Sequence, residues 1–237
     1  MKLYFDGTIS VKSILEQKKR PITMLYMDAN KKSKDFHYIA SLAKKMGVPI
    51  SIVKRDQLDL LCGHSRHGGI VLEACQRDYT NLDTISSFPF FYVNGVEDPY
   101  NLGSVCRTLY ALGINDMVIL KRDWKSAESI IQKASAGAYE KINIVQIEND
   151  QMLVDYCQAN QIPILCAHRH RAIKLTEYQW PEKVCMAVGG ALRGLSATIT
   201  SSSAQNIYIP YLNDFRNALD TPGAISILAY EMQRRKL

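Results

Sequence analysis

The chain has 237 residues, and its 29 Lys and Arg residues exceed its 23 Asp and Glu residues to give a formal net charge of +6. Hydrophobic residues make up 47% of the chain and charged residues 22%. These proportions are typical of globular proteins and exclude a disordered, collagen-like or coiled-coil chain. At roughly 100–200 residues per domain, this length accommodates one large domain or two modest ones.

Apolar segments alternate with helical patterns in the first third of the chain, which predicts α/β construction. Ser10 is the predicted N-cap of a short helix that contains Val11, Ile14 and Leu15. The other elements predicted here are strands at residues 22–27, 50–53 and 69–72 and helices at residues 34–46 and 56–62.

The polar stretch at residues 76–87 shows little periodicity and is the candidate linker. The predicted domains are therefore residues 1–80 and 89–237, with residues 81–88 between them. The second domain opens on the apolar run 89–93, which is typical of a buried strand. Further strands are predicted at residues 117–120, 142–147, 162–166, 184–188 and 207–209.

Helical patterns lie between most of these strands, so we expect a mainly parallel sheet with helices on both faces. The last helix is predicted to begin with Thr221 as its N-cap and Pro222 in its first position. Its apolar stripe consists of Ile225, Leu228, Ala229 and Met232.

The six cysteines are far apart and include no CxxC pair, which favours reduced thiols over a zinc or redox site. The N-terminus lacks the apolar region of a signal peptide, and no run approaches the ~18 apolar residues of a membrane span. We therefore expect a soluble, cytoplasmic protein with no membrane association. The mild basic excess alone gives only a faint indication of a nucleic-acid partner.

Residues 97–107 form the first segment that is suited to chemistry, because they follow a predicted strand and open a predicted helix. Gly103 and Arg107 are four residues apart, on the side opposite the predicted core stripe. A glycine at this spacing leaves room for an anionic group beside the guanidinium, which is suited to phosphate. The alternative is a solvated arginine on an amphipathic helix.

Residues 188–196 form a second segment, in which glycines permit positive φ and close approach of the backbone to a ligand. Their spacing matches neither the dinucleotide-binding nor the P-loop motif, so a plain strand-to-helix turn remains the alternative. The third segment, residues 209–224, is predicted to be a loop that leads into the last helix.

Two clusters of His and Arg, at residues 64–67 and 168–171, are candidates for a metal site. Neither has a carboxylate or cysteine at a standard ligand spacing, so no metal site is predicted. The favoured interpretation is two solvated basic loops, with phosphate contact left open.

Taken in order, these segments resemble the SpoU (TrmH-type) RNA ribose 2′-O-methyltransferases of the SPOUT superfamily. The first motif is matched by Asn101, Gly103 and Arg107. The remaining matches are a small-residue stretch at residues 134–138, a second motif at residues 188–195 and a third at residues 209–231. The first domain resembles the L30e-like RNA-binding module of that family, with residues 67–70 at its signature position.

The resemblance implies a SPOUT fold, in which a C-terminal trefoil knot follows a small α/β L30e-like domain. It implies a homodimer through the knotted domain, and methyl transfer from S-adenosylmethionine (AdoMet) to a ribose 2′-hydroxyl of structured RNA, either rRNA or tRNA. The cofactor-binding positions that it implies are Ala167, His168, Gly189, Ile209, Ala218 and Leu219.

Arg107 is the implied catalytic residue, with Asn101 beside it in the reaction site. An arginine with a pKa above ~12 is a poor general base. Two roles for Arg107 stay open. It either accepts the proton, or it only orients the hydroxyl and the adjacent phosphate and leaves proton removal to phosphate or water. Arg66, His67, Arg107 and Arg193 are the candidate RNA-binding residues.

Three positions depart from the family's pattern. Ala191 stands where the second motif has glutamate, and Ala218 and Asp220 replace the serine and asparagine of the third motif. These changes motivate an alternative function, a catalytically impaired RNA-binding or assembly protein on the same scaffold. A nicotinamide-dependent oxidoreductase is disfavoured, because no glycine-rich fingerprint follows an early strand.

Overall fold

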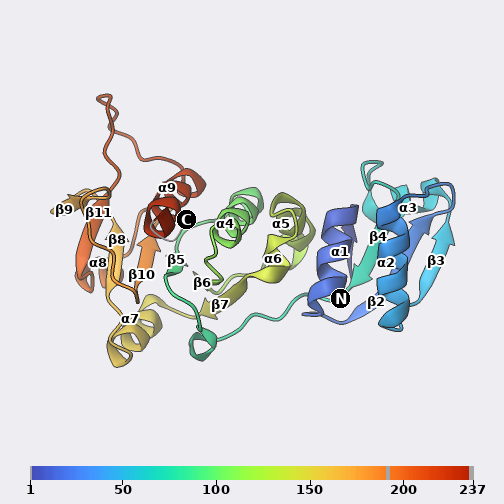
Figure 1. The fold of residues 1–237 in the computed structure, drawn as a ribbon, viewed down its shortest axis with the longest axis horizontal. Helices are drawn as coiled ribbons and strands as arrows, with labels where there is room; N and C mark the ends of the chain where they lie inside the picture. Colours follow the sequence, from blue (N-terminus) through green and yellow to red (C-terminus); the bar gives the residue numbers. More distant parts are fainter. Residues whose placement is uncertain (1, 191–192, 235–237) are drawn as a thin grey trace. The chain divides into compact units, whose positions relative to one another are not determined.

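The computed structural model describes residues 2–190 and 193–234, and the chain divides into two compact units (Figure 1). The first unit contains the chain up to Asp78 together with Trp124–Lys141, and the second contains Tyr79–Asp123 and the chain from Ile142 onward. This division by packing differs from the predicted domain boundaries at Trp124–Lys141. Helices in that segment contact the first helix and first strand of the chain, which explains the difference.

The first unit is built on a four-stranded sheet in the order β1-β4-β2-β3. β1 and β2 both pair antiparallel with β4, and β3 pairs parallel with β2. The strands are β1 (Leu3–Asp6), β2 (Ile22–Asp28), β3 (Ile50–Val53) and β4 (Ile70–Ala74). The helices are α1 (Thr8–Gln17), α2 (Lys34–Lys45), α3 (Arg55–Cys62), the short η2 (Lys125–Ala127), α5 (Glu128–Ala134) and α6 (Ala138–Lys141).

The predicted strands and helices of this unit are confirmed to within a few residues, whereas β1 was not predicted. The predicted N-cap of α1 is wrong, because Ser10 lies inside the helix and is buried. Gly7 occupies the cap position with a φ of 86°, a left-handed conformation that favours glycine. Val11, Ile14 and Leu15 are fully buried, as the apolar pattern predicts.

The second unit contains a seven-stranded sheet in the order β7-β6-β5-β10-β8-β11-β9, and every neighbouring pair is parallel. The strands are β5 (Phe90–Val93), β6 (Asp116–Leu120), β7 (Asn143–Ile147), β8 (Ile164–Ala167), β9 (Ala172–Lys174), β10 (Cys185–Val188) and β11 (Gln205–Tyr208). The helices are η1 (Leu82–Thr84), α4 (Pro99–Ala111), α7 (Asp150–Ala159), α8 (Ala197–Ser201) and α9 (Thr221–Gln233). Among these seven strands, only the short edge strand β9 was not predicted.

Helices cover both faces of this sheet, which confirms the predicted architecture. Successive side chains of a strand point to opposite faces. Phe90 and Tyr92 of β5 accordingly join a core cluster with residues of α7 and α8. On the other side of the sheet, α4 packs against α9, which contacts β10 (Figure 1).

The parallel arrangement brings the carboxyl ends of all seven strands to one edge of the sheet. Ligands of open α/β sheets bind at this edge, where the loops after β8, β10 and β11 lie. No helix in the described part of the chain is long and apolar enough to cross a membrane.

Candidate functional site

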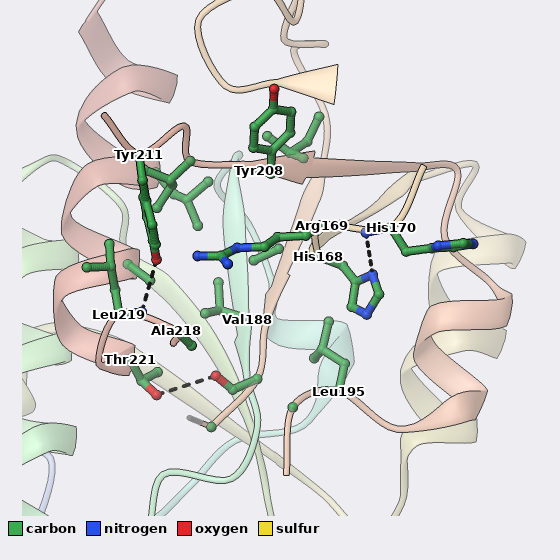
Figure 2. Close-up of a pocket in the computed structure, with 18 of the residues that line it drawn as sticks. His168, Arg169, His170, Val188, Leu195, Tyr208, Tyr211, Ala218, Leu219 and Thr221 are labelled. Atoms are coloured by element: carbon green, nitrogen blue, oxygen red, sulfur yellow. Dashed lines mark hydrogen bonds between the residues drawn. The ribbon is translucent and has the colours of Figure 1, made fainter. Parts of the chain in front are cut away.

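A cavity of about 470 Å³ lies at the carboxyl ends of β8, β10 and β11, between their loops and the start of α9. All six positions that the resemblance implies for the cofactor line this cavity: Ala167, His168, Gly189, Ile209, Ala218 and Leu219. The cavity is also lined by residues 169, 170, 188, 190, 194, 195, 207, 208, 211, 216, 221, 224 and 228. Three segments that are far apart in the sequence therefore meet at a single hollow (Figure 2).

The glycines after β10 are required because two stretches of backbone come into contact. A Cβ at Gly189 would lie 2.3 Å from the carbonyl carbon of Gly194, and one at Gly190 would lie 2.6 Å from the Gly95 oxygen. The Gly194 amide donates to the Gly190 oxygen at 2.8 Å and closes the turn. Only Gly194 of these three has a positive φ, 65°. Close approach, more than left-handed conformation, accounts for this motif.

The start of α9 closes another side of the cavity. Asp220 is the N-cap of this helix and accepts a hydrogen bond from the Gly223 amide at 2.6 Å. The prediction that Thr221 is the cap is therefore wrong. Thr221 is the first helical residue, and its hydroxyl donates to the Gly189 oxygen at 3.4 Å. The carboxylate at position 220 has a clear structural use, because a negative side chain stabilises a helix N-terminus.

The lining residues that sequence reasoning did not assign to the cofactor include Arg169, His170, Tyr211 and Arg216. The sequence did contain a signal for Arg169 and His170, because residues 168–171 lie just after the strand predicted at residues 162–166. Figure 2 shows Arg169 extending from the β8–β9 connection toward Tyr211. For Tyr211 and Arg216 there was no such signal, because nothing in the local sequence indicates that the loop after β11 approaches Arg169.

The residues implied for catalysis lie on α4. Asp98 caps this helix and accepts from the amides of Tyr100 and Asn101 at 2.6 and 3.1 Å. Both Asn101 and Arg107 are exposed, and neither is among the described residues that line the cavity. Gly103 is buried, so the prediction that it leaves an open space beside Arg107 is wrong.

The candidate RNA-binding residues of the first unit differ sharply in exposure. Arg66 is exposed, whereas His67 is completely buried. His67 Nδ1 accepts from the Gly69 amide at 2.9 Å, so Nε2 carries the proton and donates to Asp59, also at 2.9 Å. The ring thus holds the turn that leads into β4. In the second unit Arg193 is exposed, and Ala191 lies outside the described residues.

A partly buried carboxylate supports the segment that follows the glycine turn. Asp150, at the start of α7, accepts from the hydroxyls of Tyr92 and Ser196. Ser196 also caps α8 by accepting from the Ile199 amide at 3.3 Å. Burial, together with the hydrogen bond to Asp150, raises the pKa of Tyr92, which therefore remains a neutral donor. This network fixes the chain directly after Leu195.

The described residues contain no group of three or more His, Cys, Asp or Glu side chains that is arranged to hold a metal ion. The six cysteines are free thiols, and Cys106, Cys157, Cys166 and Cys185 are buried.

Comparison with known proteins yields matches to both parts of the chain. Residues 89–230 match the SpoU rRNA Methylase family, and residues 7–80 match the RNA 2′-O ribose methyltransferase substrate-binding family. A putative TrmH family tRNA/rRNA methyltransferase of Bacillus subtilis, YacO, is 25% identical over 100% of this chain and 98% of its own length. The 23S rRNA (guanosine-2′-O-)-methyltransferase RlmB of Acinetobacter baylyi is 24% identical over 99% and 98%, respectively.

Solved structures share the fold over nearly the whole chain. An AdoMet-bound rRNA methyltransferase from Sinorhizobium meliloti superposes with a TM-score of 0.84 at 18% identity, covering 100% of this chain and 88% of its own. The SpoU methyltransferase AviRb of Streptomyces viridochromogenes, in complex with AdoMet, has a TM-score of 0.82 at 17% identity, with coverages of 99% and 90%. From the family match to residues 89–230, which is more than half of its length, the chain belongs to the SpoU rRNA methylase family.

Proposed function

We propose that this protein transfers the methyl group of AdoMet to a ribose 2′-hydroxyl of rRNA or tRNA. The observation that carries the proposal is the convergence of all six implied cofactor positions on one cavity at the carboxyl edge of the parallel sheet. The relatives from Bacillus subtilis and Acinetobacter baylyi are named as RNA methyltransferases and match this chain almost from end to end.

The cavity is suited to a nucleoside cofactor. Its volume of about 470 Å³ falls within the range of about 300–1,000 Å³ that is usual for small-molecule sites. The glycine turn leaves bare backbone along one wall, where a side chain at position 189 or 190 would collide with neighbouring backbone. AdoMet supplies an activated methyl group when bound. The loops after β8, β10 and β11 would hold it, largely through backbone groups.

The chain's own contribution to the reaction is positioning. The 2′-hydroxyl must approach the methyl group in line, and accurate positioning alone lowers such a barrier by several kcal/mol, up to about 7–11. The guanidinium of Arg107 offers planar, permanently charged donors to the ribose and its phosphate, and Asn101 lies less than two turns away on the same helix. Proton removal then falls to the phosphate or to water, because a guanidinium is a poor base.

We also propose a homodimer formed through the second unit. One exposed face of α4 carries Tyr100, Arg107 and Tyr110, and an exposed face of α9 carries Ile227 and Tyr230. Exposed aromatic and apolar side chains on two packed helices are typical of a protein interface. Arg107 does not line the cavity of its own chain, so we propose that a second copy helps to complete the reaction site.

We propose that RNA contacts are made by Arg66, Arg107 and Arg193, with His67 shaping the turn beside Arg66 through its bonds to Asp59 and Gly69. Structured RNA is recognised through its shape, its 2′-hydroxyls and its unstacked bases, and exposed arginines are suited to this. Because rRNA and tRNA are the proposed substrates, we also propose that the protein is cytoplasmic. The C-terminal trefoil knot is likewise proposed from the family's fold.

The decisive experiment supplies purified protein with methyl-labelled AdoMet and total RNA from a strain that lacks the gene. We expect label in 2′-O-methylribose of one RNA, and much less label with RNA from the parent strain, whose sites are already modified. Calorimetry with AdoMet distinguishes the proposed enzyme from the alternative, a catalytically impaired RNA-binding or assembly protein. Cofactor binding without transfer to any RNA would contradict the proposed function, and RNA binding without cofactor binding would favour an assembly protein.

A further inference from the structure

The loop between β11 and α9 forms one wall of the cavity but has little structure of its own. It contains no helix or strand from Ile209 to Asp220, and its residues 212–218 are exposed. Tyr211, Arg216, Ala218 and Leu219 of this loop line the cavity. A long irregular segment of this kind opens readily unless other parts of the protein hold it.

One side chain from the opposite wall holds this loop at three points. The guanidinium of Arg169 lies 4.3 Å from the centre of the Tyr211 ring. Its Nη1 donates to the Arg216 oxygen at 3.3 Å, and its Nη2 donates to the Asn217 oxygen at 3.2 Å. Within the described part of the chain, all three of these side-chain contacts of Arg169 are made with this loop.

Tyr211 in turn contacts Leu219, near the end of the loop. Its hydroxyl accepts a hydrogen bond from the Leu219 amide at 3.1 Å, and its ring lies 6.1 Å from the ring of Phe215, centre to centre. The Tyr211 ring is thus fixed by Arg169 on its face and by Leu219 at its tip (Figure 2). Ala218 and Leu219, two of the implied cofactor positions, follow directly after the carbonyls that Arg169 binds.

We infer that Arg169 is a positioning residue that holds residues 211–219 in place as a preformed wall of the AdoMet site. The inference rests on the proposed function for the identity of the ligand, but the restraint itself needs no ligand. Arginine is suited to this task, because its planar fork bonds two carbonyls while its face stacks on an aromatic ring. A lysine keeps the charge but cannot make all three contacts.

The test compares Arg169→Lys with Arg171→Lys, the same change two residues further along the same connection. Arg171 is exposed, and the contact recorded for it within the described chain is made by its backbone oxygen, with Gln205. Tyr211→Phe is a third variant, which keeps the stacked ring but removes the acceptor of the Leu219 amide.

The first readout is amide hydrogen exchange of residues 211–219 in the protein without ligand. We expect exchange about tenfold faster in Arg169→Lys and wild-type exchange in Arg171→Lys, since a tenfold change corresponds to about 1.4 kcal/mol of opening free energy. Tyr211→Phe should accelerate exchange mainly at Leu219. Unchanged exchange in Arg169→Lys would overturn the inference.

The second readout is AdoMet affinity by calorimetry, together with steady-state kinetics. We expect Arg169→Lys to bind AdoMet about tenfold more weakly, with kcat at saturating AdoMet within about twofold of wild type, because only the cost of ordering the wall has changed. Weakened exchange protection with unchanged affinity would also overturn the positioning role. If the wild-type protein itself bound no AdoMet, the proposed function would fail independently of the exchange result.

Discussion

At the residue scale, the side chains that matter most are those whose roles differ from what their motif suggests. His67 lies in a signature of the RNA-binding module, yet it is buried and bonds Asp59 and Gly69. Asp220 replaces an asparagine of the family's third motif and acts as an N-cap, which either residue can do. This departure is therefore compatible with an intact site, and the described residues give no indication of catalytic impairment.

The residue-scale prediction concerns Arg107. We expect Arg107→Ala to lower methyl transfer by more than about a hundredfold, because positioning and charge stabilisation at a reacting centre contribute several kcal/mol. AdoMet affinity should stay within about twofold, since Arg107 does not line the cavity. Single-turnover transfer and calorimetry measure the two quantities. A variant that retained full turnover would show that another residue carries the chemistry.

At the element scale, the cavity depends on how closely the turn after β10 approaches the turn after β5. The Asn94 amide donates to the Val188 oxygen at 3.0 Å, and the next residue, Gly95, meets Gly190. Asp150 then fixes Ser196 at the start of α8, so both ends of the glycine turn are anchored. The wall of the cavity is therefore set by backbone packing and by the hydrogen bonds of Asp150.

Gly190→Ala tests this close approach. Its Cβ would lie 2.6 Å from the Gly95 oxygen, so the turn must shift, with a cost of about 1–3 kcal/mol in the free energy of unfolding. Because the shift occurs at the cavity wall, AdoMet affinity should fall at least tenfold by calorimetry.

The control for this prediction is Gly63→Ala in the first unit. Gly63 has a φ of 71° and nothing within 4 Å of an added Cβ, so the change brings strain but no collision. It should lower the melting temperature without changing AdoMet affinity. If Gly190→Ala bound AdoMet as tightly as the wild type, the turn would not form the wall of the site.

At the scale of the whole molecule, the first unit is completed by a segment that comes much later in the chain. Arg20, between α1 and β2, is fully buried with Glu128 of α5 and Glu140 of α6. Its Nη1 lies 2.6 Å from Glu128, its Nη2 bonds Glu140, and its guanidinium lies 4.6 Å from the centre of the Phe5 ring. Burial raises the pKa of Glu128, and the charge of Arg20 opposes that shift.

Replacing Arg20 by methionine leaves both carboxylates without their cation. The free energy of unfolding of this unit should fall by about 3–5 kcal/mol at pH 8, because a buried charge then lacks its partner. The pKa of Glu128 in the folded state would rise further above its unfolded value of about 4.3. The folded state then binds the extra proton, so its stability is highest at low pH and falls as the pH rises through the folded pKa. The penalty should therefore be smaller at pH 5.

Urea unfolding at pH 5 and pH 8 measures this effect. Trp124 belongs to the first unit and Trp180 to the second, so a Trp180→Phe background isolates the fluorescence of the first unit. The triple variant with Arg20→Met, Glu128→Gln and Glu140→Gln removes the charges of Arg20 and both carboxylates and should regain stability at pH 8. Equal losses at both pH values would contradict the role assigned to Glu128.

Much of the fold follows from local sequence. Short β-branched and aromatic runs such as residues 90–93 and 143–147 can bury both faces only in a covered parallel sheet, so their strands were predictable. Val105 and Leu109 mark the buried side of α4 by helical spacing alone. By contrast, β1 is only half buried and ends on Asp6, and β9 is a three-residue edge strand that is mostly exposed, so neither forms a continuous apolar run.

What the sequence by itself determined was the class of fold, from local patterns, and a resemblance to one family, from motifs. That resemblance pointed to six positions, which the structure brings together at the cavity. Only the tertiary structure decided which side chains face that cavity from another segment, as Arg169 faces Tyr211, and that Arg20 finds its partners more than a hundred residues away. It also decided that His67 is enclosed and that Gly189 and Gly190 must lack side chains. Contacts between distant segments depend on how the chain packs, and packing leaves no periodic trace in the sequence.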